Sequence, residues 1–241
     1  MEKINLNEYL ASNEYPGRGI AVAMAPDGRQ MFIGYFIMGR SENSRNRVFD
    51  PVPERGGICT IAADPAKLED PSLIIYHPVR RIDGALIVTN GDQTDTILEF
   101  LKQGLPMEQA LRTREFEPDG PNWTPRISGL LGPNGSYKLS ILKAADGTGR
   151  RCLRQTFEYP GQPGTGHFLH TYAGDGDPLP SFTGEPEQVA VEGDINSLAS
   201  AVWDALDEAN RISLFVRFTD LETRDFQQRI VNKYSGKETQ A

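Results

Sequence analysis

Cysteine and histidine are scarce in this 241-residue sequence, which has two cysteines and three histidines. Cys59 and Cys152 lie far apart without CxxC spacing, so we expect unpaired, buried thiols and no zinc site built from Cys and His. His167 and His170 would point to opposite faces of a strand and could not share one metal ion. No metal site is therefore expected.

Long apolar runs are also missing. Runs such as 73–76 and 85–88 have the length of strands, whereas a bilayer span needs about 20 residues. The first residues, MEKINL, show no basic segment followed by an apolar one, so no secretory signal is evident. These absences favour a cytoplasmic protein without a membrane partner.

Nucleotide and nucleophile motifs are absent as well. The sequence has no GxxxxGK[ST] loop, no GxGxxG after a strand and no GxSxG elbow. We therefore expect neither ATP-dependent nor dehydrogenase chemistry, and no cofactor.

Positive charge is in deficit, with 25 Lys and Arg against 33 Asp and Glu and a net charge of −8. This balance disfavours nucleic acid as a partner, because duplex binding requires a basic face. The acidity is local, however: residues 173–194 contain six acidic residues and no Lys or Arg. The rest of the chain is nearly neutral and could still hold one small anion in a local basic pocket.

Four of the Asp-Gly and Asn-Gly dipeptides fall between apolar or alternating runs and mark tight turns, which is typical of antiparallel sheets. Two predict hairpins of near-fully apolar strands: 19–24 with 31–37, and 73–76 and its continuation with 85–88. The other two precede 137–141 and 151–157, which we expect to have one wet face. Further strands are expected at 58–62, 167–172 and 214–218.

Helical periodicity is clearest at 194–210, with Asp194 as N-cap. Other helices are expected from Asp92 or Thr94 to Gly104, from Pro106 onwards, and over 6–11. Strands buried on both faces need a layer on each side. The sequence therefore predicts one α+β domain over residues 1–241, a four-layer αββα sandwich of two antiparallel sheets.

Arginines cluster where an apolar strand ends, in the segment that contains Arg40, Ser44, Arg45, Asn46 and Arg47. Arginine grips phosphate or carboxylate with two N–H groups, and Asn and Ser add neutral donors, so an anion site is predicted. The alternative is a solvated loop whose arginines pair with Glu42, Asp50 and Glu54. Arg18, between two glycines, is either a second anion contact or a surface residue.

Two more loops could carry chemistry. In 89–95, Asn90, Thr94 and free amides at a helix start could hold a polar ligand; alternatively, Asn90-Gly91 makes a turn and Asp92 caps the helix. In 115–127, a carboxylate near arginines could act as a general acid or base, or the segment is an ordinary surface loop.

Five of these pieces occur in order: Pro16-Gly17-Arg18-Gly19, Ser44-Arg45-Asn46-Arg47, Tyr76, TNGDQTD at 89–95 and NWTPRI at 122–127. Together they resemble the archaeal-type IMP cyclohydrolase family, mainly between Tyr15 and Ile127. The resemblance implies a fold like that of the N-terminal nucleophile hydrolases. It implies a different use of that fold, because the chain starts Met1-Glu2 and offers no nucleophile as residue one.

The resemblance also implies a reaction, the last step of purine synthesis. The formamide of 5-formamidoimidazole-4-carboxamide ribotide closes onto its carboxamide nitrogen and loses water, which gives inosine monophosphate. The enzyme is formally a hydrolase of a cyclic amidine C–N bond that runs as a cyclodehydratase. A non-catalytic purine-nucleotide-binding protein and an amide hydrolase of the same fold are the alternatives.

By position in the family pattern, Arg47 would hold the developing oxyanion, and Tyr76 would transfer or share a proton there. Glu117 would be the general acid or base, and Glu115 and Asp119 are the alternative residues for this role. The implied substrate-binding residues are Arg18, Arg45 and Arg126 for the phosphate, Asn90, Gly91, Asp92 and Thr124 for the base or ribose, and Ser44 and Asn46. A purine nucleotide would be the small-molecule partner, and a homo-oligomer is expected.

Overall fold

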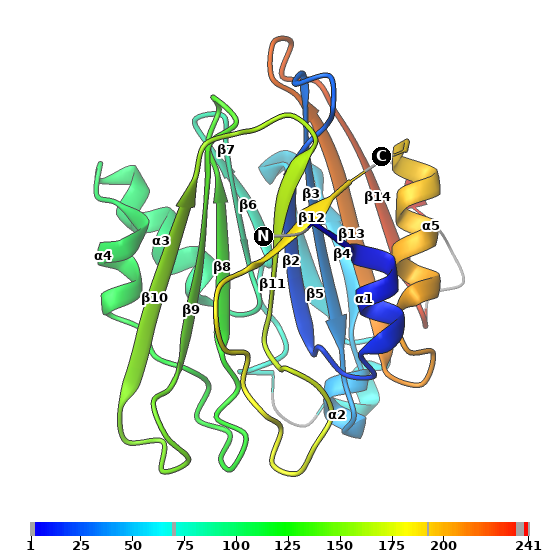
Figure 1. Ribbon diagram of the computed structural model, residues 1–241. Helices are drawn as coiled ribbons and strands as arrows, with labels where there is room; N and C mark the ends of the chain where they lie inside the picture. Colours follow the sequence, from blue (N-terminus) through cyan, green and yellow to red (C-terminus); the bar gives the residue numbers. More distant parts are fainter. Residues whose placement is uncertain (1–2, 69–70, 192, 235–238, 241) are drawn as a thin grey trace.

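The structure, a computed structural model, describes residues 3–68, 71–191, 193–234 and 239–240. Two sheets stack face to face (Figure 1). The strand order of the first is β1 (Ile4–Asn5), β12 (Glu187–Ala190), β11 (Thr165–His170), β2 (Arg18–Met24), β3 (Gln30–Met38), β13 (Arg211–Asp220), β14 (Phe226–Asn232) and β15 (Thr239–Gln240). The order of the second is β10 (Cys152–Tyr159), β9 (Tyr137–Ala144), β8 (Arg126–Leu131), β7 (Ala85–Thr89), β6 (Val79–Ile82), β5 (Gly57–Ile61) and β4 (Val48–Val52).

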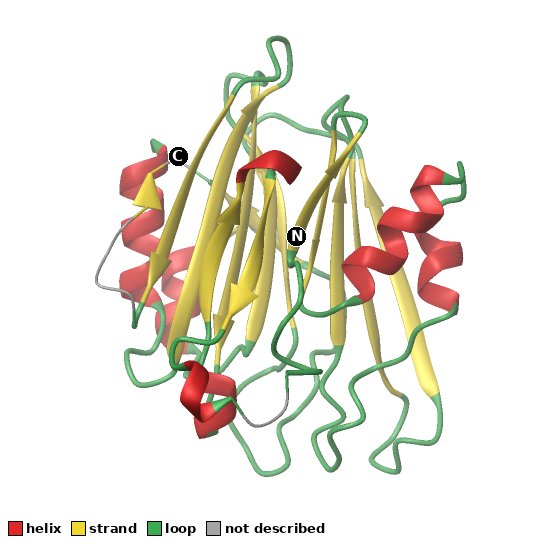
Figure 2. Ribbon diagram, turned by 180° about the vertical axis from the view of Figure 1, so that it is seen from behind, coloured by secondary structure: helices red, strands yellow, loops and turns green. Residues whose placement is uncertain are grey.

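Helices cover the outer face of each sheet. The first sheet carries α1 (Leu6–Ser12) and α5 (Ile195–Ala205), and the second carries α3 (Gln93–Lys102) and α4 (Met107–Arg112). The short helix α2 (Glu42–Arg45) and two 3₁₀ turns, Pro53–Arg55 and Pro65–Lys67, lie in connections. Figure 2 shows the same order of layers from behind. The α+β class and the αββα sandwich of mainly antiparallel sheets are thus confirmed, whereas a closer relation to the N-terminal nucleophile hydrolases stays a prediction.

Three apolar clusters fill the three spaces between the layers. Along β3, Met31, Ile33 and Ile37 point between the sheets, whereas Phe32 and Phe36 point towards α1 and α5. Side chains alternate between the two faces of a strand, so a strand covered on both sides is apolar throughout. This packing explains the near-continuous apolar runs of the sequence.

Most predicted elements are confirmed. The turns at Gly28 and Gly84 adopt positive φ and close the hairpins β2–β3 and β6–β7. The Asp194 carboxylate caps α5 by accepting from the amides of Asn196 and Ser197. Gly104 follows α3 with φ +73°, as a C′ glycine does. Among the described residues, no helix combines the length and apolar character that a bilayer span requires.

Three expectations about elements are wrong. Residues 73–76 form turns, because Pro71 accepts hydrogen bonds from the amides of Ile74 and Ile75, and only the continuation, β6, pairs with β7. Strand β9 has no wet face, because α3 and α4 cover it. Helix α5 ends at Ala205 and not near 210, because the Asp207 carboxylate accepts from the amide of Asn210 and starts a turn.

The cysteines follow the prediction in part. Cys59 and Cys152 are both unpaired, but they are half-buried and not buried.

The strands β4, β12 and β14 were not expected from the sequence, because they are short or have many polar residues.

Candidate active site

A group of buried polar side chains closes one end of the space between the sheets. It consists of Arg18, Tyr35, Arg47, Tyr76 and Glu117, which we call the arginine–glutamate cluster; their exposed fractions are between 0% and 8%. Arg18 begins β2, Tyr35 lies near the end of β3, and the others lie in connections that precede β4, β6 and β8. Segments from both sheets therefore meet in one place, which can act on a ligand as a unit.

Arg47 is completely buried, yet only part of its guanidinium is bound. Its Nε donates to the carbonyl of Ser44 at 2.8 Å, whereas Nη1 and Nη2 are buried without a partner in the described chain. Burial, followed by the charge of Arg18, lowers the pKa of Arg47. Buried donors without partners are costly, so these two nitrogens are available for an oxygen atom of a ligand.

Tyr76 is held by both its backbone and its hydroxyl. Its amide donates to Thr60 Oγ1 at 2.8 Å, and its hydroxyl lies 2.9 Å from that of Tyr35, which stacks on Phe49. Burial raises the pKa of Tyr76, although Arg47 and Arg18 oppose the rise. Tyr76 therefore stays a neutral phenol at ordinary pH and can donate a hydrogen bond.

Glu117 is 3% exposed, and its amide donates to the carbonyl of Thr124 at 2.9 Å. Burial raises the pKa of its carboxyl, and Arg18 and Arg126 oppose this rise. Within the described residues, no hydrogen bond or ion pair engages the carboxylate. The group can therefore exchange a proton with a ligand at a pH where an exposed carboxyl is fully ionised.

The two competing carboxylates are engaged elsewhere. Asp119 accepts from the amide of Thr124 at 2.7 Å and from its hydroxyl, which also lies 2.5 Å from the hydroxyl of Tyr172. Glu115 is exposed and lies 3.7 Å from Arg154. Of the three carboxylates, Glu117 is thus the buried one that has no partner among the described residues.

Arg18 is buried and not a surface residue, so that alternative is wrong. Its amide donates to Thr171 Oγ1 at 3.1 Å. Burial would lower the pKa of Arg18, but Tyr15 and Glu117 raise it more, so the guanidinium stays charged. Gly17 is required before it, because its φ is +77° and a Cβ would lie 2.3 Å from Thr171 Oγ1.

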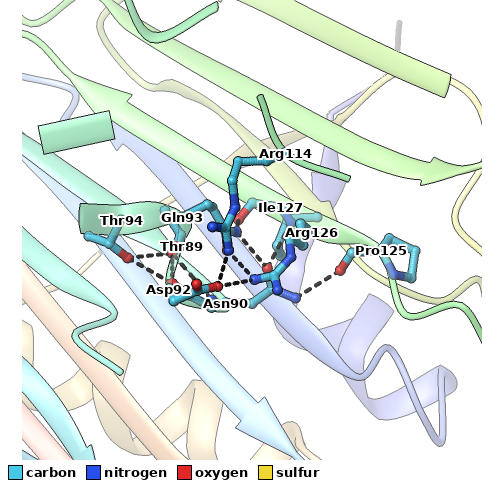
Figure 3. Close-up of polar contacts among 10 residues, drawn as sticks. Thr89, Asn90, Asp92, Gln93, Thr94, Arg114, Pro125, Arg126 and Ile127 are labelled. Carbon is cyan, nitrogen blue, oxygen red and sulfur yellow. Dashed lines mark hydrogen bonds and ion pairs between the residues drawn. The ribbon is translucent and has the colours of Figure 1, made fainter. Parts of the chain in front are cut away.

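The 89–95 loop forms a dense network with the start of β8 (Figure 3). Asn90, 1% exposed, donates to the carbonyl of Pro125 at 2.8 Å and accepts from the amide of Ile127 at 2.8 Å. Thr94 shares hydrogen bonds with Thr89 and Gly91. These contacts join the first turn of α3 to the strand that follows Glu117.

Asp92 stands at the N-cap position of α3, but its side chain makes no capping hydrogen bond, so the capping alternative is wrong. Its carboxylate binds Arg114 and, at 2.8 Å, Arg126 (Figure 3). Gly91 leaves room for this pair, because a Cβ there would lie 2.3 Å from Arg126 Nη1. Arg126 therefore already has an anionic partner within the protein.

The arginine segment 40–47 is divided by the structure. Arg45 donates to the carbonyl of Gly39 at 2.9 Å and to Asn210, and Asn46 exchanges hydrogen bonds with Asp64. Both line a separate cavity of about 470 Å³.

Two other polar residues of this segment also bind within the protein. Ser44 donates to Ser41, and Arg40 pairs with Asp175 at 2.6 Å. The alternative partners Glu42, Asp50 and Glu54 bind none of these arginines among the described residues, and Arg47 alone of the segment joins the cluster.

Replacement of Asn90 by Ala tests whether this residue is structural. The change would leave Pro125 and Ile127 with buried, unpaired backbone groups, so we expect a loss of about 2–4 kcal/mol in the free energy of unfolding. Urea denaturation measures it, with Asn122→Ala as a more exposed control. Unchanged stability together with weaker nucleotide binding would instead assign Asn90 to the ligand.

Comparison with known proteins fits this geometry. A model of the family described as "IMP cyclohydrolase-like protein" matches residues 15–224. The IMP cyclohydrolase of Methanosphaera stadtmanae is 30% identical over 137 residues, which are 53% of this chain and 63% of that protein. Those of Methanococcus aeolicus and Methanopyrus kandleri are 30% and 29% identical over 165 and 149 residues, which are 66% and 56% of this chain and 74% and 72% of theirs.

The chain thus spans less than two thirds of the Methanosphaera protein and nearly three quarters of the other two. The family model, in contrast, covers all five members of the arginine–glutamate cluster. Because this match extends over most of the sequence, the chain belongs to the IMP cyclohydrolase-like protein family.

Proposed function

We propose that this chain is an IMP cyclohydrolase, which closes the formamide of 5-formamidoimidazole-4-carboxamide ribotide onto its carboxamide nitrogen to give inosine monophosphate and water. The names of the relatives support this reaction. The observation that carries it in the structure is the pair of buried, unpaired Arg47 nitrogens beside Tyr76 and Glu117. We further propose that residues 1–241 act as one domain, as a homo-oligomer, in the cytoplasm.

Arg47 acts on the oxygen of the formyl group. When the carboxamide nitrogen attacks the formyl carbon, a C–N bond forms and the formyl oxygen gains negative charge. Nη1 and Nη2 of Arg47 donate to this oxyanion, and they need no reorganisation because no acceptor among the described residues competes for them. A carboxamide nitrogen is a weak nucleophile, so positioning and this charge stabilisation supply most of the rate.

Glu117 and Tyr76 move the protons. The ionised Glu117 carboxylate accepts a proton from the attacking nitrogen and passes it to the oxyanion, which becomes a hydroxyl. The carboxylate then takes the proton of the formamide N–H and delivers it to this hydroxyl, so that the C–O bond breaks, water leaves and the C=N bond of the ring forms. The raised pKa of Glu117 suits both steps, because it lies closer to neutrality than that of an exposed carboxyl. Tyr76 donates to the same oxygen while its own hydroxyl remains within 2.9 Å of Tyr35.

Arg18 is the best candidate for the phosphate. It is charged, and its buried Nε has no hydrogen-bond partner in the described chain. Arg45 and Arg126 bind protein acceptors already, and Ser44, Asn46, Asn90, Gly91, Asp92 and Thr124 hold their loops, so the ligand roles of these residues stay predictions.

Purified protein with the formylated ribotide tests the reaction directly. Ring closure changes the ultraviolet absorbance, and we expect turnover at substrate concentrations in the micromolar range. A relative with the named activity serves as the positive control. If the protein binds inosine monophosphate, as measured by a thermal shift, but shows no turnover, it is a nucleotide-binding protein instead.

Tyr76→Phe removes only the hydroxyl. We expect kcat to fall by about 10²-fold, because the oxygen loses a proton donor. The matched control is Tyr137→Phe, since Tyr137 is equally buried and its hydroxyl binds His167 at 2.6 Å on β11 outside the cluster. Equal losses of kcat in the two variants would remove Tyr76 from the mechanism.

A further inference from the structure

Another buried arginine, Arg217, lies between the sheets, outside the arginine–glutamate cluster. Arg217 is on β13 and is 2% exposed. It has the same orientation as Phe215, two residues earlier, which belongs to the core between the sheets. Its Nη2 donates to the carbonyl of Gly56 at 3.0 Å and to Gln228, whereas Nε is buried without a partner in the described chain.

No acidic side chain of the described residues lies within 4 Å of the Arg217 guanidinium. Two other buried arginines of this protein do have a carboxylate partner: Arg80 binds Asp95 at 3.0 Å, and Arg126 binds Asp92. Burial, followed by the charge of Arg81, lowers the pKa of Arg217 to about 9. A buried charge without a counter-ion is costly, and an anion would remove that cost.

A cavity of about 260 Å³ lies against this arginine. Arg217, Arg81 and Arg224 line it, together with the apolar side chains of Met31, Leu86 and Leu131. Asp83 also lines it, but within the described residues it forms no ion pair with an arginine. The cavity adjoins a wider hollow of about 900 Å³ that shares Arg81 and Phe226, which provides a path from solvent.

Phe226 and Gly56 hold Arg217 and Arg81 close together. Arg217 lies over the Phe226 ring at 4.2 Å, and Arg81 lies over the same ring at 5.4 Å. Gly56 separates the two arginines: its carbonyl binds Arg217, and a Cβ would lie 2.6 Å from Arg81 Cδ. The aromatic ring and the bare glycine therefore keep two positive charges close without a carboxylate between them.

The cavity lies at the other end of the sandwich from the proposed reaction site. Met31 is at the start of β3, and Ile37, which pairs with Arg18, is near its end. Six residues of strand separate the two ends by about 20 Å. A ligand of the cavity is therefore distinct from the substrate of the arginine–glutamate cluster.

We propose that this cavity is a second ligand site, which binds a small organic anion. The carboxylate or phosphate group of the ligand binds Arg217 and Arg81, and its apolar part packs on Met31, Leu86 and Leu131. The guanidinium forks of two arginines suit either group.

Isothermal titration of the full chain with sodium benzoate, and separately with inorganic phosphate, tests the site. We expect saturable binding of at least one probe, and the probe that binds identifies the anionic group. Arg81→Gln should weaken this binding about tenfold, because it removes one of two charged donors but leaves an exposed position in the fold. Arg18→Gln, at the other end of the sandwich, should leave it unchanged.

Arg217→Gln should abolish the binding. In the wild-type protein, the NMR resonance of Arg217 Nε–H should shift when the probe is added. This second measurement tests the site even if the Arg217→Gln variant does not fold. The proposal is overturned if neither probe binds, if Arg81→Gln binds as tightly as the wild-type protein, or if Arg18→Gln abolishes binding. None of these outcomes depends on ring-closure activity.

Discussion

Arg47→Met is expected to lower kcat for ring closure by about 10²–10³-fold, the usual effect of removing one oxyanion donor. The free energy of unfolding should stay the same or rise. The guanidinium is completely buried, and two of its nitrogens have no partner in the described chain, so the apolar side chain removes a desolvation cost. Steady-state kinetics and urea denaturation of the same preparation measure both effects.

The matched control is Arg80→Met. Arg80 is also a buried arginine, but it faces α3 and binds Asp95 at 3.0 Å. This variant should lose stability and keep kcat, the opposite of Arg47→Met. If Arg47→Met keeps its turnover, or loses stability as Arg80→Met does, Arg47 is a structural residue and the proposed mechanism is wrong.

The sequence predicted the fold because its signals were local. Asp-Gly turns, the Asp194 cap and the glycine after α3 each depend on a few neighbouring residues, and each lies where it was expected. The prediction for 73–76 was wrong because an apolar tetrapeptide fits a partly buried turn as well as a strand. Its flanking prolines, Pro71 and Pro78, were the available signal for a turn.

The site was predictable only in part, because its contacts join distant segments. Arg18, Arg47, Tyr76 and Glu117 lie close together in the structure, and the roles that the resemblance gives them stay predictions. Tyr35 was missed as a site residue, because it lies in an apolar strand and its role depends on a hydroxyl from another segment. The one sign in the sequence was a tyrosine near the end of an apolar strand, on the side of the strand that faces the space between the sheets.

Arginine clustering in sequence was a weaker guide than burial. Arg45 and Arg47 are two residues apart, yet one binds the carbonyl of Gly39 and the other has two nitrogens without a partner in the described chain. The decisive property is a buried guanidinium nitrogen that has no acceptor there, which only the tertiary structure reveals. Arg217 has the same property at the other end of the sandwich.

Glu117→Gln is expected to lower kcat by about 10²–10⁴-fold, because the amide can neither accept the proton of the attacking nitrogen nor return one to the leaving hydroxyl. The side chain keeps its size, so the fold should survive. Glu115→Gln is the matched control: its carboxyl is exposed, and kcat should not change. A large loss in the control, with normal turnover in Glu117→Gln, would assign the proton transfers to Glu115.

The same variant should change how stability depends on pH. The pKa of Glu117 in the folded protein is raised above the ordinary 4.5, so the folded state holds this proton after the unfolded chain has lost it. The wild-type protein therefore loses stability as the pH rises from 4.5 through the folded pKa, and Glu117→Gln should lack this loss. Above that range the variant is expected to be the more stable protein. Urea denaturation at a series of pH values measures the difference, and parallel curves for the two proteins would show that Glu117 has no raised pKa and cannot serve as the proton carrier near neutrality.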